Sequence, residues 1–210
     1  DFKNTKLFNV ITGYLVGTAT NLAANFSLDQ GVIKSILVLS PTPTTKGVAK
    51  VGSKITASPG AWDAGVTLTF QWFRNGEAIA NANNQDYLLT PDDFKTAISV
   101  TVTGTGTGGV SKSKQSLDKP VAVGEMKATA PKITGVVAKG KTIKVSVKPW
   151  VSNASITYSW LLDGKAIKGA TKSSYKVLPT QVGKKISVSV KQVAYGYTTT
   201  TKVSTAQKVK

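Results

Sequence analysis

Lysine is the residue type with the clearest chemical potential in this chain, because the lysines are concentrated in one part of it. The 210 residues carry 27 basic and 10 acidic side chains, for a formal net charge of +17. Residues 125 to 210 hold 16 Lys, no Arg and only two acids, whereas residues 1 to 124 hold 11 basic and 8 acidic side chains. So many amino groups can attract polyanions through Coulombic steering and counterion release. Because Arg and its planar fork are missing there, such binding would be delocalised and sensitive to salt.

Nine lysines of this region are candidate ligands for a polyanion. Some occupy outward positions of expected strands, and others lie in expected turns, where the loops of a β-sandwich commonly form binding sites. The strand positions are Lys144, Lys148, Lys176 and Lys191, and the turn positions are Lys165, Lys168, Lys172, Lys184 and Lys185. The expected partner is an anionic cell-wall polymer or an acidic polysaccharide, without specific readout of nucleic-acid bases. The alternative left open is that lysines on exposed strands only prevent edge-to-edge pairing and keep the protein soluble.

Four aromatic side chains are candidates for stacking on a sugar ring. Trp62 and Trp150 occupy matching places at the end of a strand, just before a loop, and Tyr195 and Tyr197 lie in the run AYGYTT. Tryptophan and tyrosine offer a ligand an apolar face and a polar handle. The alternative for the tryptophans is that they close the end of a sandwich, and for the tyrosines that they belong to an ordinary turn.

The sequence argues against most catalytic and metal chemistry. It contains no Cys and no His, so it has neither thiolate ligands nor the usual general base. Asp92 and Asp93, in TPDDF, suit the cap of a short helical turn better than a calcium site, which needs about six or more oxygens. We therefore expect no enzyme activity, no metal and no cofactor. The apolar runs SILVL and YLV are too short for a transmembrane helix.

An internal repeat must position the candidate residues. Shifting the chain by 88 positions aligns residues 47 to 114 with residues 135 to 202 without a gap. The matches include Trp62 with Trp150, Trp72 with Trp160, Gly76 with Gly164, Tyr87 with Tyr175 and Pro91 with Pro179. A fixed period without insertions indicates tandem modules, and about 88 residues suits one small β-sandwich.

Within each copy, apolar residues alternate with a period of two, as in strands that turn one face toward a core. The inward positions are Leu68, Phe70 and Trp72 in TLTFQWFRNG, and Ile156, Tyr158, Trp160 and Leu162 in SITYSWLLDG. The dipeptides NG at 75–76 and DG at 163–164 predict tight hairpin turns. Roughly seven short strands per copy predict an all-β fold of tandem immunoglobulin-like β-sandwiches.

The two copies resemble the cysteine-free bacterial immunoglobulin-like repeats found in tandem in secreted or surface proteins of actinobacteria. The resemblance covers residues 42 to 208 and rests mainly on the pieces PGAW, QWFRNG and ISVTVTG. The second copy departs from it at VKPW, so the loop there is expected to differ in shape. The resemblance implies a secreted or cell-surface setting and a parent catalytic or adhesive domain N-terminal to this chain. It implies no shared ligand.

We expect three segments along the chain. Residues 1–39 form a partial β-sandwich or β segment, in which NFSLDQG resembles the closing strand and turn of a carboxypeptidase-regulatory-like or CnaB-like sandwich. The run LSPTPTTKG then predicts a stiff linker, because a residue before proline favours an extended conformation. Residues 40–124 form the first immunoglobulin-like domain, and residues 125–210 form the second, strongly basic one.

These patterns predict a non-catalytic accessory region of a secreted or cell-wall-associated bacterial protein. It would act as a spacer and, through its lysine-rich second domain, as a surface-attachment module. Two alternatives stay open. One is a module that binds a neutral polysaccharide such as starch or another glucan through exposed aromatic residues. The other is a purely structural stalk of a larger extracellular hydrolase.

Overall fold

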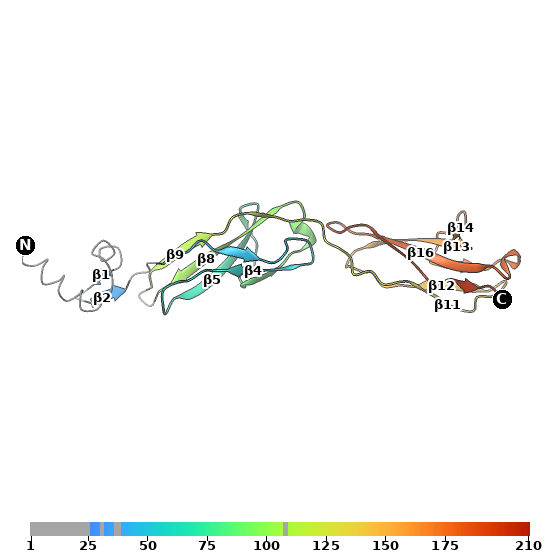
Figure 1. Cartoon of the computed structure of the whole chain (residues 1–210), viewed down its shortest axis with the longest axis horizontal. Helices are drawn as coiled ribbons and strands as arrows, with labels where there is room; N and C mark the ends of the chain where they lie inside the picture. The colour runs from blue at the N-terminus through green and yellow to red at the C-terminus, as the bar shows by residue number, and fades with distance from the viewer. Residues whose placement is uncertain (1–25, 30–31, 36–38, 107–108) are drawn as a thin grey trace, which may run out of the picture. The chain divides into compact units, whose positions relative to one another are not determined.

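The computed structural model describes residues 26–29, 32–35, 39–106 and 109–210, and their regular structure is almost entirely β (Figure 1). Strands β1 (Phe26–Asp29) and β2 (Val32–Ser35) precede the repeat and pair antiparallel. Most of the expected N-terminal segment 1–39 lies outside the described residues. Of the run NFSLDQG, which was compared with a CnaB-like sandwich, the structure describes Phe26–Asp29, as β1.

The first copy, residues 40–124, folds into two sheets. One sheet has the strand order β3-β4-β7, and the other has the order β10-β8-β5-β6, with β9 also paired to β8. The elements are β3 (Thr44–Lys46), β4 (Lys54–Ser58), β5 (Thr67–Arg74), β6 (Glu77–Ala78), β7 (Asp86–Leu88), the 3-10 helix η1 (Pro91–Asp93), β8 (Ala97–Thr105), β9 (Ser111–Gln115) and β10 (Lys119–Pro120).

The second copy, residues 125–210, repeats this topology. Its three-stranded sheet has the order β11-β12-β15, and its five-stranded sheet has the order β14-β13-β16-β17, with β18 also paired to β16. The elements are β11 (Lys132–Thr134), β12 (Thr142–Ser146), β13 (Ser155–Leu162), β14 (Lys165–Ala166), β15 (Ser174–Lys176), η2 (Pro179–Gln181), β16 (Lys185–Val193), β17 (Thr200–Val203) and β18 (Gln207–Lys208). The predicted fold, tandem immunoglobulin-like β-sandwiches, is confirmed.

The alternating apolar residues form the core of each copy. In the second copy, Ile143 from the three-stranded sheet and Trp160 and Val188 from the five-stranded sheet are 0% exposed and share one cluster. The Trp160 ring stacks on Tyr175 of β15, with 5.6 Å between the ring centroids. Trp72 and Tyr87 form the same stacked pair in the first copy, also at 5.6 Å. The two central tryptophans are therefore core residues, as predicted.

Each central tryptophan also holds the segment between two short strands. The indole Nε1 of Trp160 donates a hydrogen bond to the carbonyl of Lys172 at 2.9 Å, and its backbone N–H donates to Ala170 at 3.0 Å. Trp72 makes the corresponding hydrogen bonds at the same two distances, to the carbonyls of Asn84 and Ala82. Because the acceptors are backbone carbonyls, the side chains of this segment can change while its path is kept.

The predicted hairpin turns are confirmed. Asn75 and Gly76 have φ of 49° and 83°, and Asp163 and Gly164 have φ of 49° and 81°. Two consecutive positive φ values suit Asn-Gly and Asp-Gly pairs in a two-residue turn. The Asp163 carboxylate also accepts the backbone N–H of Lys185 at 2.8 Å, so it is engaged within its own hairpin.

The predicted cap in TPDDF is confirmed for Asp93. Its buried carboxylate accepts the backbone N–H of Thr90 at 2.7 Å and the Thr90 hydroxyl at 3.0 Å. At the matching place in the second copy, the Gln181 side-chain oxygen accepts the backbone N–H of Leu178 at 2.9 Å. A neutral amide thus replaces a carboxylate in the same structural role.

Two compact units account for the described chain. The second unit consists of Val48–Lys54, Leu88–Thr96 and Pro120–Lys210, and the first holds the other described residues. The second unit thus includes three pieces of the first copy, namely Val48–Lys54, Leu88–Thr96 and residues 120–124.

Removal of the central indole tests this account of the core. We expect Trp160→Ala to lower the free energy of unfolding by about 3–5 kcal/mol, as for other buried aromatic residues. We expect Trp160→Phe to cost less, because the ring volume is largely kept and only the hydrogen bond to Lys172 is lost. Urea unfolding followed by circular dichroism measures both. Leu117→Ala, at an 86% exposed leucine, is the control and should change stability by less than about 0.5 kcal/mol. A small effect of Trp160→Ala would contradict the account.

Candidate functional site

All nine candidate lysines are exposed. Lys168, Lys172 and Lys184 lie outside the strands, as predicted. Lys165 and Lys185 do not lie in turns: each is the first residue of a strand, β14 and β16 respectively. For Lys165, the reason is that the hairpin turn needs only two residues, Asp163 and Gly164, so pairing resumes at once. Lys185 begins β16 because it pairs with Lys208 of β18. Lys148 does not lie on a strand as predicted, because β12 ends at Ser146, where its pairing with β11 stops.

Strand register brings several lysines onto the outer face of the three-stranded sheet. Thr142 pairs with Lys176, and Lys144 pairs with Ser174, while the intervening Ile143 and Tyr175 point inward. Lys144 and Lys176 therefore share the outer face, as the alternation of inward and outward positions predicted. Register adds one lysine that the sequence reasoning missed. Lys132 of β11 pairs with Ser146 on the same face, and its position before the inward Ile133 could have revealed it.

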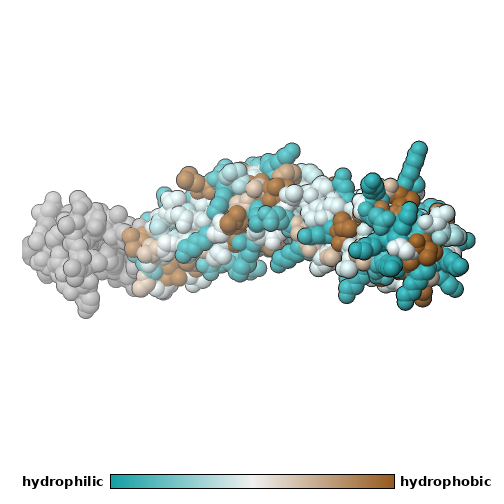
Figure 2. Space-filling view, turned by 45° about the vertical axis from the view of Figure 1, so that its right-hand side comes forward, coloured by the Kyte–Doolittle hydropathy of each residue, from teal (hydrophilic) through white to brown (hydrophobic). Residues whose placement is uncertain are grey.

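No carboxylate of the described residues lies close enough to neutralise these amino groups. Within 125–210, all of which the structure describes, Glu125 lies 3.7 Å from Lys50 and Asp163 accepts a backbone N–H. Among the described residues, none of the 16 lysines of 125–210 lies within 4.0 Å of a carboxylate oxygen. Hydrophilic side chains project from the surface of the second copy, with smaller hydrophobic areas between them (Figure 2). The second copy therefore presents uncompensated positive charge.

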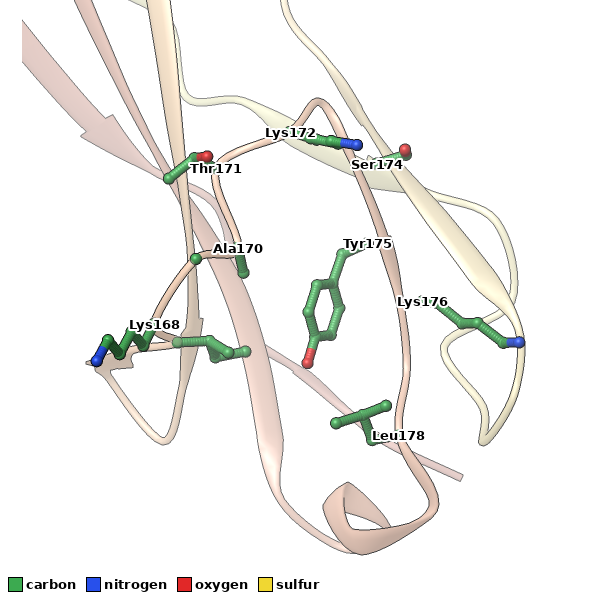
Figure 3. Close-up of a pocket in the computed structure, with 10 residues that line it drawn as sticks. Lys168, Ala170, Thr171, Lys172, Ser174, Tyr175, Lys176 and Leu178 are labelled. Atoms are coloured by element: carbon green, nitrogen blue, oxygen red, sulfur yellow. The ribbon is translucent and has the colours of Figure 1, made fainter.

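An open hollow of about 330 Å³ lies along the segment of residues 167–178, which we call the lysine segment. Three lysines line it, Lys168, Lys172 and Lys176, together with Tyr175 and Leu178. The Tyr175 ring lies in the middle, with its hydroxyl directed toward Leu178, and the Lys168 and Lys176 amino groups extend outward on opposite sides (Figure 3). The hollow therefore combines an apolar floor beside the Tyr175 ring with a polar rim that includes amino groups.

A hydrogen-bond network fixes the Tyr175 hydroxyl as an acceptor. The Gln181 side-chain oxygen accepts the backbone N–H of Leu178, so the other end of this amide must be its NH₂ group. That group donates to Tyr175 Oη at 2.7 Å. Sequence reasoning missed this link, because pattern alone does not bring Gln181 to the hydroxyl.

The aligned segment of the first copy has the same backbone and a different charge. Residues 79–90 contain one charged side chain, Asp86, where residues 167–178 contain three lysines and no acid. Ala80, Asn84 and Leu88 stand where the second copy has its lysines. Asp86 is already engaged, because its carboxylate accepts the Thr56 hydroxyl at 2.5 Å. The hydrogen bonds from the central tryptophan to this segment agree between the copies within about 0.1 Å.

Trp62 and Trp150 lie in the loops that follow β4 and β12, beyond the strand ends where the sequence placed them, and both are only partly exposed. The Trp62 ring covers Gly104, where any Cβ would overlap it, and its Nε1 donates to the Pro59 carbonyl at 3.1 Å. In the second copy, buried Gln192 takes the place of Gly104 and accepts the backbone N–H of Trp150 at 2.9 Å. Trp150 Nε1 is buried and has no hydrogen-bond partner among the described residues. The predicted difference in loop shape is seen in the backbone, because Gly60 has a φ of 81° and the aligned Lys148 has no positive φ.

The two candidate tyrosines differ in access. Tyr195 is 68% exposed, and its ring lies edge-on to Phe94, with 5.6 Å between the centroids. Tyr197 is half-buried, because its ring lies over Gly124, where a Cβ would come within 3.0 Å of it. Tyr195 therefore keeps an open face for a ligand and Tyr197 keeps less of one. Sugar contact at either residue stays a prediction.

No group of three or more acids, cysteines or histidines that could hold a metal ion occurs in the described part of the chain. None of its helices has the length and apolar character required to cross a membrane.

No family model matches the chain. Among curated proteins, it is similar to the highly immunogenic outer capsid protein of Enterobacteria phage T4, with 25% identity over 176 residues. The match covers 79% of this chain and 46% of the relative, so the chain spans about half the length of that protein.

Several solved structures share some similarity. An adhesin of an Antarctic bacterium that binds ice shows 13% identity and a TM-score of 0.36, over 81% of this chain and 49% of that chain. Three N-terminal domains of the bacteriophage RB49 outer capsid protein show 14% identity and a TM-score of 0.27, over 83% of this chain and 69% of that chain. Tandem immunoglobulin repeats of Dlar show 13% identity and a TM-score of 0.23, over 80% of this chain and 94% of that chain. The fold assignment rests on strand order and core rather than on these scores, and the comparisons give no support for an actinobacterial source.

Substitution at Trp62 distinguishes packing from ligand stacking. We expect Trp62→Ala to lower the unfolding free energy by about 2–4 kcal/mol, because the indole covers Gly104. Gly104→Ala should destabilise by about 1–3 kcal/mol by displacing the same ring. Chemical unfolding of both variants provides the measurement. If Trp62→Ala left stability unchanged but abolished binding to starch, the ring would be a ligand contact instead.

Proposed function

We propose that this chain is a non-catalytic accessory region of a protein displayed outside the cell or on a particle surface. It acts as a spacer and as an attachment module that holds its parent against an anionic polymer. The second copy makes the attachment through the exposed lysines of its three-stranded sheet and of the lysine segment.

The contrast between the copies carries this proposal. Both keep the same core pair and the same hydrogen bonds to the segment after the hairpin, so folding does not require the lysines. The lysines are nevertheless concentrated in the second copy, where no carboxylate of the described residues compensates them. Uncompensated charge of one sign raises the local concentration of opposite charge and speeds association with it. A polyanion is the partner that this surface fits best.

The similarity to a phage outer capsid protein is compatible with a surface setting. That relative is an outer component of its particle by name, and this chain matches about half of it. We propose that the parent is likewise longer and exposed, with a catalytic or adhesive part outside this chain. A bacterial secreted or cell-wall protein and a phage surface protein both suit the proposal.

A structural stalk is the second candidate function, because lysines also occupy edge strands. Lys132, Lys165 and Lys176 lie on β11, β14 and β15, each at the edge of its sheet. Charged edge residues prevent strands of separate molecules from pairing. This role needs no ligand, so it predicts no binding to any polymer at physiological salt. A neutral-sugar module, with exposed Tyr195 as a contact, predicts binding that salt does not weaken.

Ionic strength separates the three functions. We expect the full chain to bind immobilised dextran sulfate, with an affinity that falls about tenfold to a hundredfold between about 50 and about 200 mM NaCl, because bound lysines release counterions. Biolayer interferometry over a salt series gives the slope, and neutral dextran and starch are the controls. Salt-insensitive binding to the neutral glucans would establish the sugar module, and absence of binding to every polymer would establish the stalk.

A further inference from the structure

The Tyr175 hydroxyl has a hydrogen to donate at the hollow. Gln181 uses the hydroxyl oxygen as an acceptor, at 2.7 Å. Among the described residues, no acceptor lies in hydrogen-bond geometry for the Tyr175 hydroxyl proton. A hydroxyl holds one donor and two acceptor sites, so this proton can point to an oxygen placed in the hollow. The replacement of the buried Asp93 by Gln181 thus supplies an N–H donor where the first copy has a carboxylate.

The rim of the hollow adds positive charge without blocking access. Lys168, Lys172 and Lys176 are exposed and lie on different sides of the Tyr175 ring (Figure 3). Gly169 replaces Asn81 of the first copy, and both have positive φ, at 76° and 60°. The second copy therefore removes a side chain from the rim without a change in backbone conformation. Exposed lysines can turn toward a bound anion, at some cost in side-chain entropy.

The floor of the hollow is suited to a sugar ring. Ile167, Ala170 and Leu178 line it beside the Tyr175 ring, and its volume of about 330 Å³ is at the small end of ligand sites. Such sites commonly combine an apolar lining with a few polar groups that fix orientation. The second copy has no Arg, whose planar fork suits phosphate and nucleic-acid recognition. An acidic sugar fits this combination better than a nucleic acid.

We infer that this hollow is the primary subsite for an acidic polysaccharide, binding one sulfate, phosphate or carboxylate group of a sugar residue. The anionic oxygen accepts the Tyr175 hydroxyl proton, the lysine rim neutralises the charge, and the sugar ring rests on the apolar floor. This inference rests on the proposed attachment function and gives it a location. It differs from attraction spread evenly over the second copy, in which every lysine would count alike.

Two triple variants of the full chain test the location. The first, Lys168→Ala with Lys172→Asn and Lys176→Leu, installs the residues of the first copy at aligned positions. The second, Lys191→Thr with Lys202→Thr and Lys208→Thr, removes the same charge from exposed positions of the five-stranded sheet. At about 50 mM salt, we expect the first to weaken dextran sulfate binding at least about tenfold more than the second. Thermal unfolding of both variants verifies that they are folded.

The outcomes separate the inference from the proposed function. Equal losses in the two variants would overturn the inference and leave surface attachment standing, because total charge alone would then decide affinity. No binding by the unchanged chain would refute the proposed function and the inference with it. Tighter binding of single-stranded DNA than of dextran sulfate, lost in the first variant only, would make the ligand a nucleic acid and overturn the sugar assignment.

Removal of one hydroxyl tests the role given to Tyr175. We expect Tyr175→Phe to weaken dextran sulfate binding about threefold to tenfold, the usual effect of losing a hydrogen bond to a charged group. Tyr87→Phe removes the aligned hydroxyl of the first copy and should leave affinity unchanged. Unfolding midpoints of both variants distinguish lost contact from lost stability. An unchanged affinity in folded Tyr175→Phe would overturn this role.

Discussion

The hydrogen bond from a buried indole to a backbone carbonyl is the constraint on which each copy depends. It joins Trp72 to Asn84 and Trp160 to Lys172, at 2.9 Å in both cases. The indole is fully buried between two sheets, so an unmet N–H there would be costly. The hydrogen bond that satisfies this N–H fixes the path of the segment that crosses to the other sheet. Since the acceptor belongs to the backbone, any side chain can follow that path.

This arrangement separates stability from recognition. Both copies keep a stacked Trp–Tyr pair in the core and a side-chain cap at the short 3-10 helix. The exposed side chains of residues 79–90 and 167–178, in contrast, differ in charge. Exposed lysines contribute little to folding, because water and salt screen them. They can nevertheless dominate association with a polyanion, where many weak attractions add. Duplication of a β-sandwich thus allows the exposed side chains of one copy to change without loss of the shared core.

The sequence predicts the fold well because its signals are local and periodic. Alternation of period two located the inward residues of β5 and β13, and the NG and DG dipeptides located both hairpins. The cap in TPDDF was predictable for the same reason. The candidate site was predicted less completely, because it depends on contacts between distant residues. The alternation of inward and outward positions identified Lys144 and Lys176, but the pairing register of the strands was needed to add Lys132. The hydrogen bond that Gln181 donates to Tyr175 depends on a side-chain network that no sequence pattern encodes.

Transfer of the lysines to the first copy tests most directly whether core and recognition are separable. Ala80→Lys, Asn84→Lys and Leu88→Lys, all exposed, place the rim of the second copy on the aligned segment. We predict an unfolding midpoint within a few degrees of that of the original chain. The control variant carries Ser111→Lys, Ser113→Lys and Gln115→Lys on exposed β9 and so adds the same charge elsewhere. We predict that the graft raises the affinity for dextran sulfate about tenfold more than this control does. A folded graft whose affinity rises no more than that of the β9 variant would contradict the account.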